Sequence, residues 1–321
     1  MQSQVTSSVR VTHRRQEADD IISLELEALD GGNLPPFEAG AHIDVHIAPG
    51  IVRQYSLCNA PSERHRYVIG ILRDPQSRGG SVAIHETLQP GAIVVIGMPR
   101  NHFPLKPQAP SILLAGGIGI TPMLCMAETL HAAGTEFSLH YCVRNQSKAA
   151  FLDRIAQSAF SANVIFHYDD QPDEQRLRPD ELFSQTGATQ EIYVCGPAGF
   201  IEWVCRAADG AGIAKHRVRY EHFGAKAVDV SQDTAFDVKL AGSGQLFHVP
   251  ADQSVASVLL AAGVDIYTSC GEGSCGSCVM RLVEGVADHR DVFLTDEEHA
   301  SGDQFTPCCS RAKSPLLVLD L

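Results

Sequence analysis

The strongest constraint on this chain is a set of four cysteines near its C-terminus. Cys270, Cys275 and Cys278 follow the spacing C-x4-C-x2-C, and Cys308 comes after a long gap. This is the ligand spacing of plant-type [2Fe–2S] clusters. Glycine and serine separate the thiols, so backbone amides can turn towards the cluster sulfurs. The spacing therefore predicts a C-terminal domain that transfers one electron at a time.

A structural zinc site and a disulfide framework are the alternative interpretations of these cysteines. Zinc sites usually combine two C-x2–4-C pairs, and this loop contains only one such pair. The fourth ligand stays open on spacing alone, because Cys308 and Cys309 are adjacent and successive residues of an extended segment point to opposite faces. The iron–sulfur interpretation is preferred, with one of these two thiols completing the site.

The length of 321 residues predicts three domains of roughly 100 residues each. The N-terminus lacks the apolar stretch of a signal peptide, so the ten cysteines indicate a reducing cytoplasm rather than a secreted protein. The longest apolar run, 112–126, is interrupted by glycine and proline and is too short to span a bilayer. We expect a soluble, cytoplasmic protein with no membrane partner, and nothing demands more than a monomer.

The net charge of −13 argues against nucleic acid as a partner, because binding it requires a basic surface. From Ala227 onward the chain carries 14 acidic and 5 basic side chains, so this last third holds −9 of the total. Such an excess is either an ordinary solvated surface or a docking face for a basic or mixed protein partner.

The pattern of elements divides the chain into a barrel, a parallel α/β sheet and a small β-rich domain. Residues 1–104 alternate short β-rich runs with turns, with one helix at 81–88, which indicates an antiparallel barrel. From 105 to 226, strands at 111–115, 137–143, 163–167 and 191–194 alternate with helices at 122–130, 149–157 and 200–208, as in a parallel sheet. A polar linker at 227–234 precedes a β-rich domain, 235–321, around one helix at 255–262.

Two glycine turns of the predicted parallel sheet indicate a dinucleotide. Gly116, Gly117 and Gly119 lead a buried strand into a helix that begins near Thr121 and Pro122, where free N–H groups attract phosphate. Cys195-Gly196-Pro197 ends another strand of the same sheet. Each turn alone is equally a tight strand-to-helix connection, and the first lacks the third glycine of the G-x-G-x-x-G pattern. Together they favour a nicotinamide dinucleotide.

NADH is favoured over NADPH by the residues at the predicted adenosine end. Asp169 and Asp170 follow a predicted strand, and carboxylates there would repel a 2′-phosphate. Arg144 is evidence in the other direction, and the two aspartates are equally explained as turn residues.

A flavin is required between a two-electron hydride donor and a one-electron cluster. Two segments of the barrel supply its contacts. Arg53-Gln54-Tyr55-Ser56 offers a cation for phosphate, an aromatic ring and a hydroxyl, and Arg78-Gly79-Gly80-Ser81 opens a helix whose first amides can hold phosphate. Each segment alone is more often an ordinary surface arginine or a glycine turn.

These motifs, in this order over essentially the whole chain, resemble the phthalate dioxygenase reductase and vanillate O-demethylase reductase family. The resemblance extends to Glu221-His222-Phe223-Gly224, to 287–291 and to 308–314. It implies an FMN-binding barrel, an NADH-binding domain and a β-grasp ferredoxin domain that together reduce a separate Rieske-type oxygenase. Gln54 and Leu72 depart from phthalate dioxygenase reductase, which has a hydroxyl residue and a lysine there.

The resemblance also implies roles for individual residues. It favours Cys308 as the fourth cluster ligand, and it brings Thr121 and Cys195 close to the flavin and nicotinamide as the catalytic positions. The cofactor-binding positions that it implies are Arg53, Gln54, Tyr55, Ser56, Gly70, Ile71, Leu72, Arg78, Gly79, Gly80, Ser81, Gly116, Gly117, Gly119, Thr121, Cys195, Gly196, Pro197 and Phe223.

The expected activity is that of an NADH-dependent oxidoreductase: hydride passes from NADH to FMN, and single electrons pass through the [2Fe–2S] cluster to the oxygenase. A self-sufficient reductase of a quinone or ferric chelate is one alternative. A redox-sensing or metal-binding interaction protein without enzymatic activity is the other. The sequence does not name the aromatic substrate of the oxygenase, because a reductase never contacts it.

Overall fold

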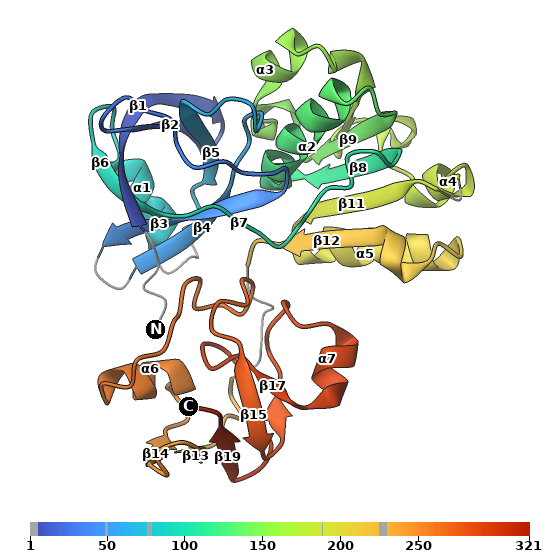
Figure 1. Ribbon diagram of the computed structural model, residues 1–321. Coiled ribbons are helices and arrows are strands. Elements are labelled where there is room, and N and C mark those ends of the chain that lie inside the picture. The colour runs from blue at the N-terminus through green and yellow to red at the C-terminus, as the bar shows by residue number, and fades with distance from the viewer. Residues whose placement is uncertain (1–5, 49–50, 76–78, 188, 225–229) are drawn as a thin grey trace. The chain divides into compact units, whose positions relative to one another are not determined.

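The computed structural model describes the chain except for residues 1–5, 49–50, 76–78, 188 and 225–229. The chain forms two compact units, Met1–Glu221 and His222–Leu321 (Figure 1). Within the described residues, no helix combines the length and the apolar character needed to cross a bilayer.

The first unit contains an antiparallel sheet that curls into a barrel. Its strands are β1 (Thr6–Ala18), β2 (Ile21–Ala28), β3 (Ala41–Ala48), β4 (Ile51–Ser56), β5 (Arg66–Leu72), β6 (Ile93–Gly97) and β7 (Arg100–Asn101). They run in the order β4-β3-β6-β1-β2-β5, with β7 paired to β3. An isolated bridge between Leu57 and Ile69 joins the chain after β4 to β5 and closes the barrel. The expected antiparallel barrel is thus confirmed.

Strand β1 was not predicted, because its apolar signal is weak. Only Val9 and Val11 of its central residues are buried, and polar side chains surround them. These two valines pack into a core with the interior residues of β2, β3 and β5. The helix α1 (Gly80–Thr87) follows β5 and lies one residue ahead of its expected bounds.

The first unit also contains the expected parallel α/β sheet. Its strands are β8 (Ser111–Gly116), β9 (Phe137–Val143), β10 (Val164–Tyr168), β11 (Glu191–Gly196) and β12 (Val218–His222), in the order β10-β9-β8-β11-β12. The pairs among β8, β9, β10 and β11 are parallel. Every residue of β8 and β11 is buried, as a central parallel strand requires.

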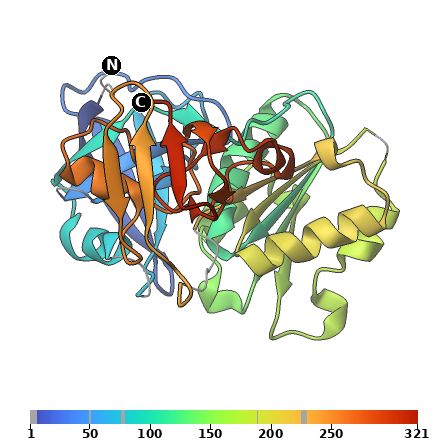
Figure 2. The ribbon, with the colours of Figure 1, turned by 90° about the horizontal axis from the view of Figure 1, so that it is seen from below.

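Helices cover this sheet, and α5 lies along one of its faces in the view from below (Figure 2). The helices are α2 (Ile120–Ala132), α3 (Leu152–Gln157), α4 (Pro179–Ser184) and α5 (Ala198–Gly210). Helix α3 is shorter than the predicted 149–157, because Phe151 adopts a left-handed φ of 62° and the helix starts only after it. Single 3-10 turns are η1 (Gly117–Gly119), η2 (Gln146–Lys148), η3 (Ser161–Asn163), η4 (Asp173–Gln175) and η5 (Lys215–Arg217).

The second unit is a mixed sheet packed against one helix, as expected for a β-grasp domain. The strands β13 (Phe236–Leu240), β14 (Leu246–Val249), β15 (Met280–Glu284), β17 (Gln304–Phe305) and β19 (Leu316–Leu319) run in the order β14-β13-β19-β15-β17. A separate pair joins β16 (Ala287–Asp288) to β18 (Arg311–Ala312). Strands β13 and β19 are parallel, and α6 (Val255–Ala261) packs its buried residues into the same core.

A second helix in this unit, α7 (Asp296–Ser301), was not predicted. It has no buried residue and therefore no apolar periodicity to detect. Its start is stabilised by a capping box, in which Thr295 Oγ1 accepts the Glu298 N–H and the Glu298 carboxylate accepts the Thr295 N–H. The sequence feature that could have indicated this helix is the T-x-x-E pattern of Thr295 and Glu298, which is typical of a helix start.

Candidate active site and metal centre

The first phosphate cradle lies where β4 meets the start of α1. Gly79, with a left-handed φ of 82°, directly precedes the helix. A Cβ added to Gly80 would lie 2.8 Å from Arg53 Cγ and 2.9 Å from Arg53 Nε, so the guanidinium group packs over the first helical turn. The N-terminal end of a helix and the cation both attract an anion, and a flavin phosphate fits this arrangement.

Ser81, also expected in this cradle, is buried and has local partners. Its hydroxyl accepts the Asp74 N–H at 3.1 Å and lies 3.4 Å from the Asp74 carbonyl oxygen. The hydroxyl therefore holds the chain that leads into α1. Arg78 lies outside the described residues.

A second group of polar side chains joins the end of β4 to β11 and β12. The Ser56 hydroxyl donates to Glu221 Oε2 at 3.4 Å. Burial raises the pKa of the Glu221 carboxyl to about 8, against the opposing effect of the Ser56 hydrogen bond. Cys195 is fully buried, and its desolvation, together with the nearby Glu221 carboxyl, raises the pKa of the thiol well above its usual value. At neutral pH the thiol is thus uncharged and most of the carboxyl is protonated, which suits an apolar flavin or nicotinamide ring.

The role of Glu221 was not predicted. The sequence showed it only inside the Glu221-His222-Phe223-Gly224 motif, and the lone signal was a carboxyl residue at the end of a strand.

The two glycine turns of the parallel sheet lie against each other. A Cβ at Gly119 would lie 2.1 Å from the Cys195 carbonyl oxygen, and one at Gly196 would lie 3.0 Å from Gly116 Cα. Such close backbone approach leaves room only for glycine. Gly117 adopts a left-handed φ of 55° and begins η1, which leads into α2. The first N–H groups of α2 thus lie at the carboxyl edge of the sheet, where a pyrophosphate fits.

Phe200 completes this edge and was not predicted. A Cβ at either Gly116 or Gly196 would lie 2.9 Å from its Cδ1 atom, so the ring covers both turns. Its ring centroid lies 6.1 Å from that of Trp203, which is 39% exposed. The sequence feature that could have indicated this role is an aromatic residue in the first turn of α5, the helix that begins after the Pro197 cap.

Thr121 joins the parallel sheet to the barrel within the first unit. Its hydroxyl donates to the Ile118 carbonyl at 3.0 Å, and a Cβ on Gly70 of β5 would lie 2.7 Å from its methyl carbon. The same added Cβ on Gly70 would lie 3.1 Å from Phe151 Cζ. Thr121 is 1% exposed, so its contribution is a close apolar contact beside Gly70 rather than a free hydroxyl.

The expected adenosine end lies after β9 and β10. The Asp169 N–H donates to the Val143 carbonyl and the Asp170 N–H to the Arg144 carbonyl, so the carboxylates and the arginine follow neighbouring strands. Arg176 binds the Asp169 carbonyl through Nη2 at 2.7 Å. Acidic and basic side chains therefore both lie at this edge of the parallel sheet.

Other expected cofactor-binding residues have mixed positions. Gln54 donates through Nε2 to the buried Asp44 carboxylate at 3.0 Å. Tyr55 is half-buried, Ile71 is buried, and Leu72 is 39% exposed. Phe223 is 40% exposed and belongs to the second unit.

The cysteine loop gathers the expected thiols in the second unit. Left-handed glycines interrupt it at Gly271, Gly273 and Gly276. The Cys270 sulfur accepts the Glu272 N–H at 3.3 Å, and the Cys275 sulfur accepts the Ser277 N–H at 3.5 Å. Backbone amides thus point at the sulfurs, and this donor set fits an iron–sulfur cluster.

Cys308 and Cys309 turn to different partners. The Cys308 thiol lies within hydrogen-bonding reach of Cys270, Cys278 and Cys309. Besides Cys308, the Cys309 sulfur contacts Thr306 and Ser310, at 3.6 Å from Thr306 Oγ1 and 3.9 Å from Ser310 Oγ. Cys270, Cys275 and Cys278 are at most 5% exposed, so these three thiols are shielded from solvent, whereas Cys308 is partly exposed.

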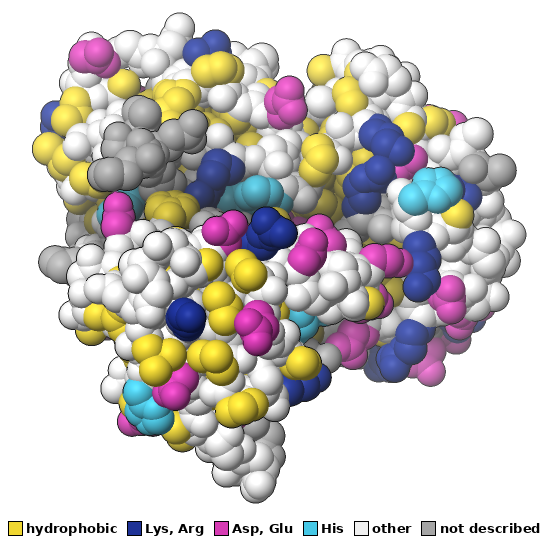
Figure 3. All heavy atoms as spheres, turned by 60° about the horizontal axis from the view of Figure 1, so that its bottom comes forward, with side chains coloured by type: hydrophobic (Ala, Val, Ile, Leu, Met, Phe, Trp, Pro, Cys, Tyr) yellow, Lys and Arg dark blue, Asp and Glu magenta, His cyan; other side chains and the backbone are white. Residues whose placement is uncertain are grey.

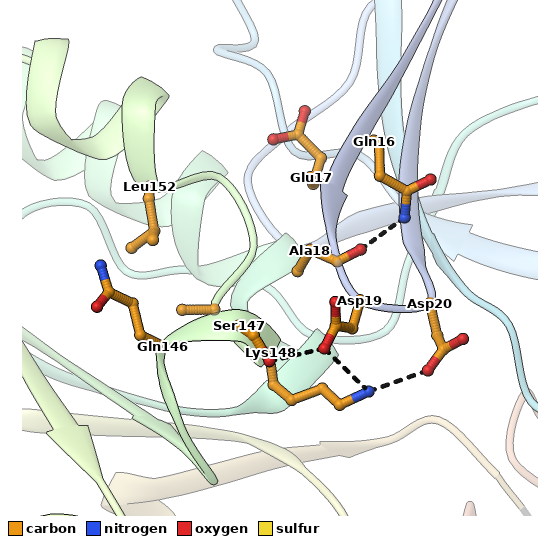
Figure 4. Close-up of a pocket in the computed structure, with 10 residues that line it drawn as sticks. Gln16, Glu17, Ala18, Asp19, Asp20, Gln146, Ser147, Lys148 and Leu152 are labelled. Carbon is orange, nitrogen blue, oxygen red and sulfur yellow. Dashed lines mark hydrogen bonds and ion pairs between the residues drawn. The ribbon is translucent and has the colours of Figure 1, made fainter.

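The first unit also has a hollow of about 640 Å³ between the β1–β2 turn and η2 (Figure 4). Lys148 Nζ lies 3.0 Å from Asp20 Oδ2 and 3.8 Å from Asp19 Oδ2, and Ser147 Oγ donates to Asp19 at 2.6 Å. Among the residues that the structure describes, none of those expected in the cofactor sites lines this hollow.

Two parts of the chain match models of known families. Residues 113–206 match the oxidoreductase NAD-binding domain, and residues 238–313 match the 2Fe-2S iron-sulfur cluster binding domain. The fold and these matches define an NAD-binding iron–sulfur oxidoreductase with a flavin-reductase type of barrel.

Whole-chain relatives define the family more closely. The chain is 50% identical over 314 residues to vanillate O-demethylase oxidoreductase of Pseudomonas sp. (strain HR199 / DSM 7063), covering 98% of this chain and 99% of the relative. It is 41% identical over 320 residues to tetrachlorobenzoquinone reductase of Sphingobium chlorophenolicum, covering 98% of each. A solved structure of phthalate dioxygenase reductase, described as modular for electron transfer from pyridine nucleotides to [2Fe-2S], matches with a TM-score of 0.79, 40% identity and 98% coverage of each chain.

The chain therefore belongs to the family of phthalate dioxygenase reductase and vanillate O-demethylase oxidoreductase. The family expected from the sequence is confirmed, and so are the fold class and the assignment as an oxidoreductase.

Proposed function

We propose that this protein is an NADH-dependent reductase that uses FMN and a [2Fe–2S] cluster to supply electrons to a Rieske-type terminal oxygenase or O-demethylase. The observation that carries the proposal is the combination, in one chain, of three sites. These are the Arg53–α1 cradle, the uncharged Ser56–Cys195–Glu221 group and the gathered thiols.

When bound, the flavin accepts a hydride and releases single electrons, which the cluster receives. Arg53 and the first turn of α1 anchor the flavin phosphate. The glycine turns at Gly116 and Gly196 hold the pyrophosphate of NADH. The contact between Thr121 and Gly70 sets the spacing between barrel and sheet, which orients donor and acceptor.

Ser56, Cys195 and Glu221 form the polar surroundings of the reaction centre. At pH 7 the Glu221 carboxyl holds a proton, because its pKa lies near 8. No negative charge then opposes the approach of an electron-rich ring, and Ser56 fixes the carboxyl in place.

NADH is preferred to NADPH in this proposal, because the Asp169 and Asp170 carboxylates at the adenosine end repel a 2′-phosphate. The cluster ligands are Cys270, Cys275, Cys278 and Cys308. The domain bounds are 1–104 for the FMN barrel, 105–226 for the NADH domain, 227–234 for the linker and 235–321 for the ferredoxin domain.

The acidic last third of the chain docks the oxygenase in this proposal. Figure 3 shows acidic side chains beside hydrophobic and basic ones on one face of the molecule, and the excess of 14 acidic over 5 basic side chains from Ala227 onward supports attraction to a basic surface. The protein acts as a monomer in the cytoplasm. Its affinity for the oxygenase should fall with rising salt, and an affinity that is flat across ionic strength would contradict electrostatic docking.

An anaerobic titration of the purified protein with NADH, followed by visible absorbance, tests the electron path. Bleaching of flavin and cluster together, completed at about three electrons per chain, is expected for one flavin and one [2Fe–2S] centre. A protein that is colourless, or whose flavin bleaches while no cluster signal responds, would refute the path.

The second candidate function is direct reduction of a quinone, favoured by the similarity to tetrachlorobenzoquinone reductase. Steady-state turnover with a chlorinated benzoquinone and no oxygenase present tests it. A rate comparable to that with the oxygenase would support the second function, and a rate far below it would favour the first.

A further inference from the structure

Three potential metal ligands meet in the second unit apart from the four gathered thiols. His289 and Asp291 follow β16, and His299 lies in α7, the polar helix beside β17 (Figure 1). The Nδ1 or Nε2 atoms of the two histidines and a carboxylate oxygen of Asp291 all lie within 4.8 Å of one another. Two imidazoles and one carboxylate are a common ligand set for divalent transition metals.

Asp291 is held in place by hydrogen bonds that do not involve the histidines. Its side chain is completely buried. It accepts the Leu294 N–H at 2.8 Å and the Thr306 hydroxyl at 3.1 Å, and Ser310 Oγ lies 3.4 Å away. Such outer hydrogen bonds orient a carboxylate ligand and are typical of metal sites.

Both imidazoles face this carboxylate, but only that of His299 lies within hydrogen-bonding distance of it. His299 Nε2 lies 3.3 and 3.2 Å from the two Asp291 oxygens. His289 Nδ1 lies 3.7 Å from Asp291 Oδ1, beyond hydrogen-bonding distance. This buried nitrogen has no hydrogen-bond partner within the described residues. A buried polar nitrogen without a partner is costly, and a metal ion would satisfy it.

We propose that His289, Asp291 and His299 bind one divalent ion of the Zn²⁺ or Ni²⁺ class, with the remaining coordination positions open to water. The imidazole rings are stacked, with centroids 4.3 Å apart and planes 23° from parallel. Each lone pair lies in its own ring plane, and two stacked, nearly parallel planes do not meet close to the rings, so one ring must turn for both to reach the same ion. The His299 side chain is 26% exposed, which gives this ring room to turn and gives the ion a path of entry.

The site is joined to the cysteine loop through its backbone. The Val292 N–H donates to the Gly273 carbonyl at 3.0 Å, and a Cβ on Gly273 would lie 2.8 Å from Asp291 Cα. Thr306 and Ser310, which contact Asp291, flank Cys308 and Cys309 in the sequence. Ion binding would therefore stiffen both segments that carry the proposed cluster ligands.

The test is a Zn²⁺ titration of the oxidised, cluster-loaded full chain by calorimetry in a non-chelating buffer, with iron content measured before and after. One saturable Zn²⁺ per chain, a raised thermal midpoint and unchanged iron are expected. H299Q and H289Q should each weaken binding by at least about tenfold. The matched control is H248Q, because His248 also pairs with an aspartate, Asp237, at 2.9 Å in the same unit but has no third ligand among the described residues. H248Q should bind Zn²⁺ like the wild type.

Three results would overturn the proposal. They are no saturable binding by the wild type, unweakened binding by both H299Q and H289Q, and uptake of Zn²⁺ in proportion to lost iron, which would place the ion among the cluster thiols. None of these results bears on the NADH titration, so the metal site and the proposed electron path are tested separately.

Discussion

The Ser56 hydroxyl donates to Glu221 Oε2 at 3.4 Å across 165 residues of sequence. This bond ties the end of the barrel strand β4 to the last strand of the parallel sheet, β12. It therefore joins the two halves of the proposed flavin–nicotinamide site, and Cys195 lies close enough for the Glu221 charge to affect its thiol.

The E221Q variant should remove a pH dependence from flavin reduction. In the wild type the carboxyl loses its proton around pH 8, so the rate of flavin reduction by NADH should fall as pH rises through that value. The variant cannot ionise and should show a flat profile between pH 6 and 9. Stopped-flow absorbance measures both profiles, and a variant that keeps the wild-type transition would exclude Glu221 as its source.

The same carboxyl should reduce the stability of the wild type at high pH. Its folded pKa of about 8 lies above the unfolded value of 4.5, so the native state binds more protons between these values and stability falls as pH rises through that window. Because the side chain is only partly buried, we expect the loss of unfolding free energy to be about 2 kcal/mol, less than the whole pKa shift would give. In thermal unfolding, the midpoint of E221Q relative to that of the wild type should be higher at pH 9 than at pH 5. An equal difference at both pH values would contradict this.

The substitutions C308S and C309S should separate the cluster ligand from its neighbour. Cys308 turns to Cys270 and Cys278, so C308S should lose the cluster or make it labile. Cys309 turns to Thr306 and Ser310, so C309S should keep its iron and its reduced-state magnetic resonance signal. Iron and sulfide analysis of both proteins is the measurement. The reverse pattern would assign Cys309 as the ligand.

The R53A variant should bind FMN about 10- to 100-fold more weakly, because a charge-assisted contact contributes about 1.5–3 kcal/mol. Fluorescence titration of the flavin-free protein measures this loss. R66A is the matched control: Arg66 is another half-buried arginine of the barrel, but its partners are Glu25 and Glu63. If both variants lost flavin equally, the effect would come from the barrel's stability rather than from the cradle.

His140 should make the parallel sheet sensitive to acid. Desolvation, with a smaller effect of His167, lowers the pKa of His140 to about 4. The unfolded chain therefore binds more protons between pH 4 and 6.5, and up to about 3 kcal/mol of stability is lost as pH falls through that window. H140Q should show a shallower loss in thermal unfolding. H131Q, at an exposed position of α2, should keep the wild-type slope.

The hydrogen bonds of this histidine pair explain why its neutral form is stable. His167 Nδ1 lies 3.1 Å from the Gln175 carbonyl, which can only accept, so that nitrogen carries the proton. His167 Nε2 then accepts from His140 Nδ1 at 3.0 Å. Protonation of His167 would place a hydrogen on both of its nitrogens, so Nε2 could no longer accept and the bond would persist only if the His140 ring changed tautomer and accepted at Nδ1.

Local spacing determined much of this protein from the sequence alone. The C-x4-C-x2-C loop, the strand-to-helix glycine turns and the alternation of strands and helices depend on residues close together in the chain. The backbone conformation of short segments follows from such residues, for example from the glycines at 271, 273 and 276 that adopt left-handed φ. The barrel, the parallel sheet and the ferredoxin domain could therefore be predicted, along with three of the proposed cluster ligands.

Tertiary packing decided the contacts between residues distant in sequence. No local pattern showed that Ser56 meets Glu221, that Phe200 covers Gly116, or that His299 meets Asp291. The directions of Cys308 and Cys309 were also open, because adjacent side chains on an extended segment differ only in the face they occupy. These outcomes depend on which surfaces are buried together when the whole chain folds, and that choice is set by non-local packing rather than by spacing along the sequence.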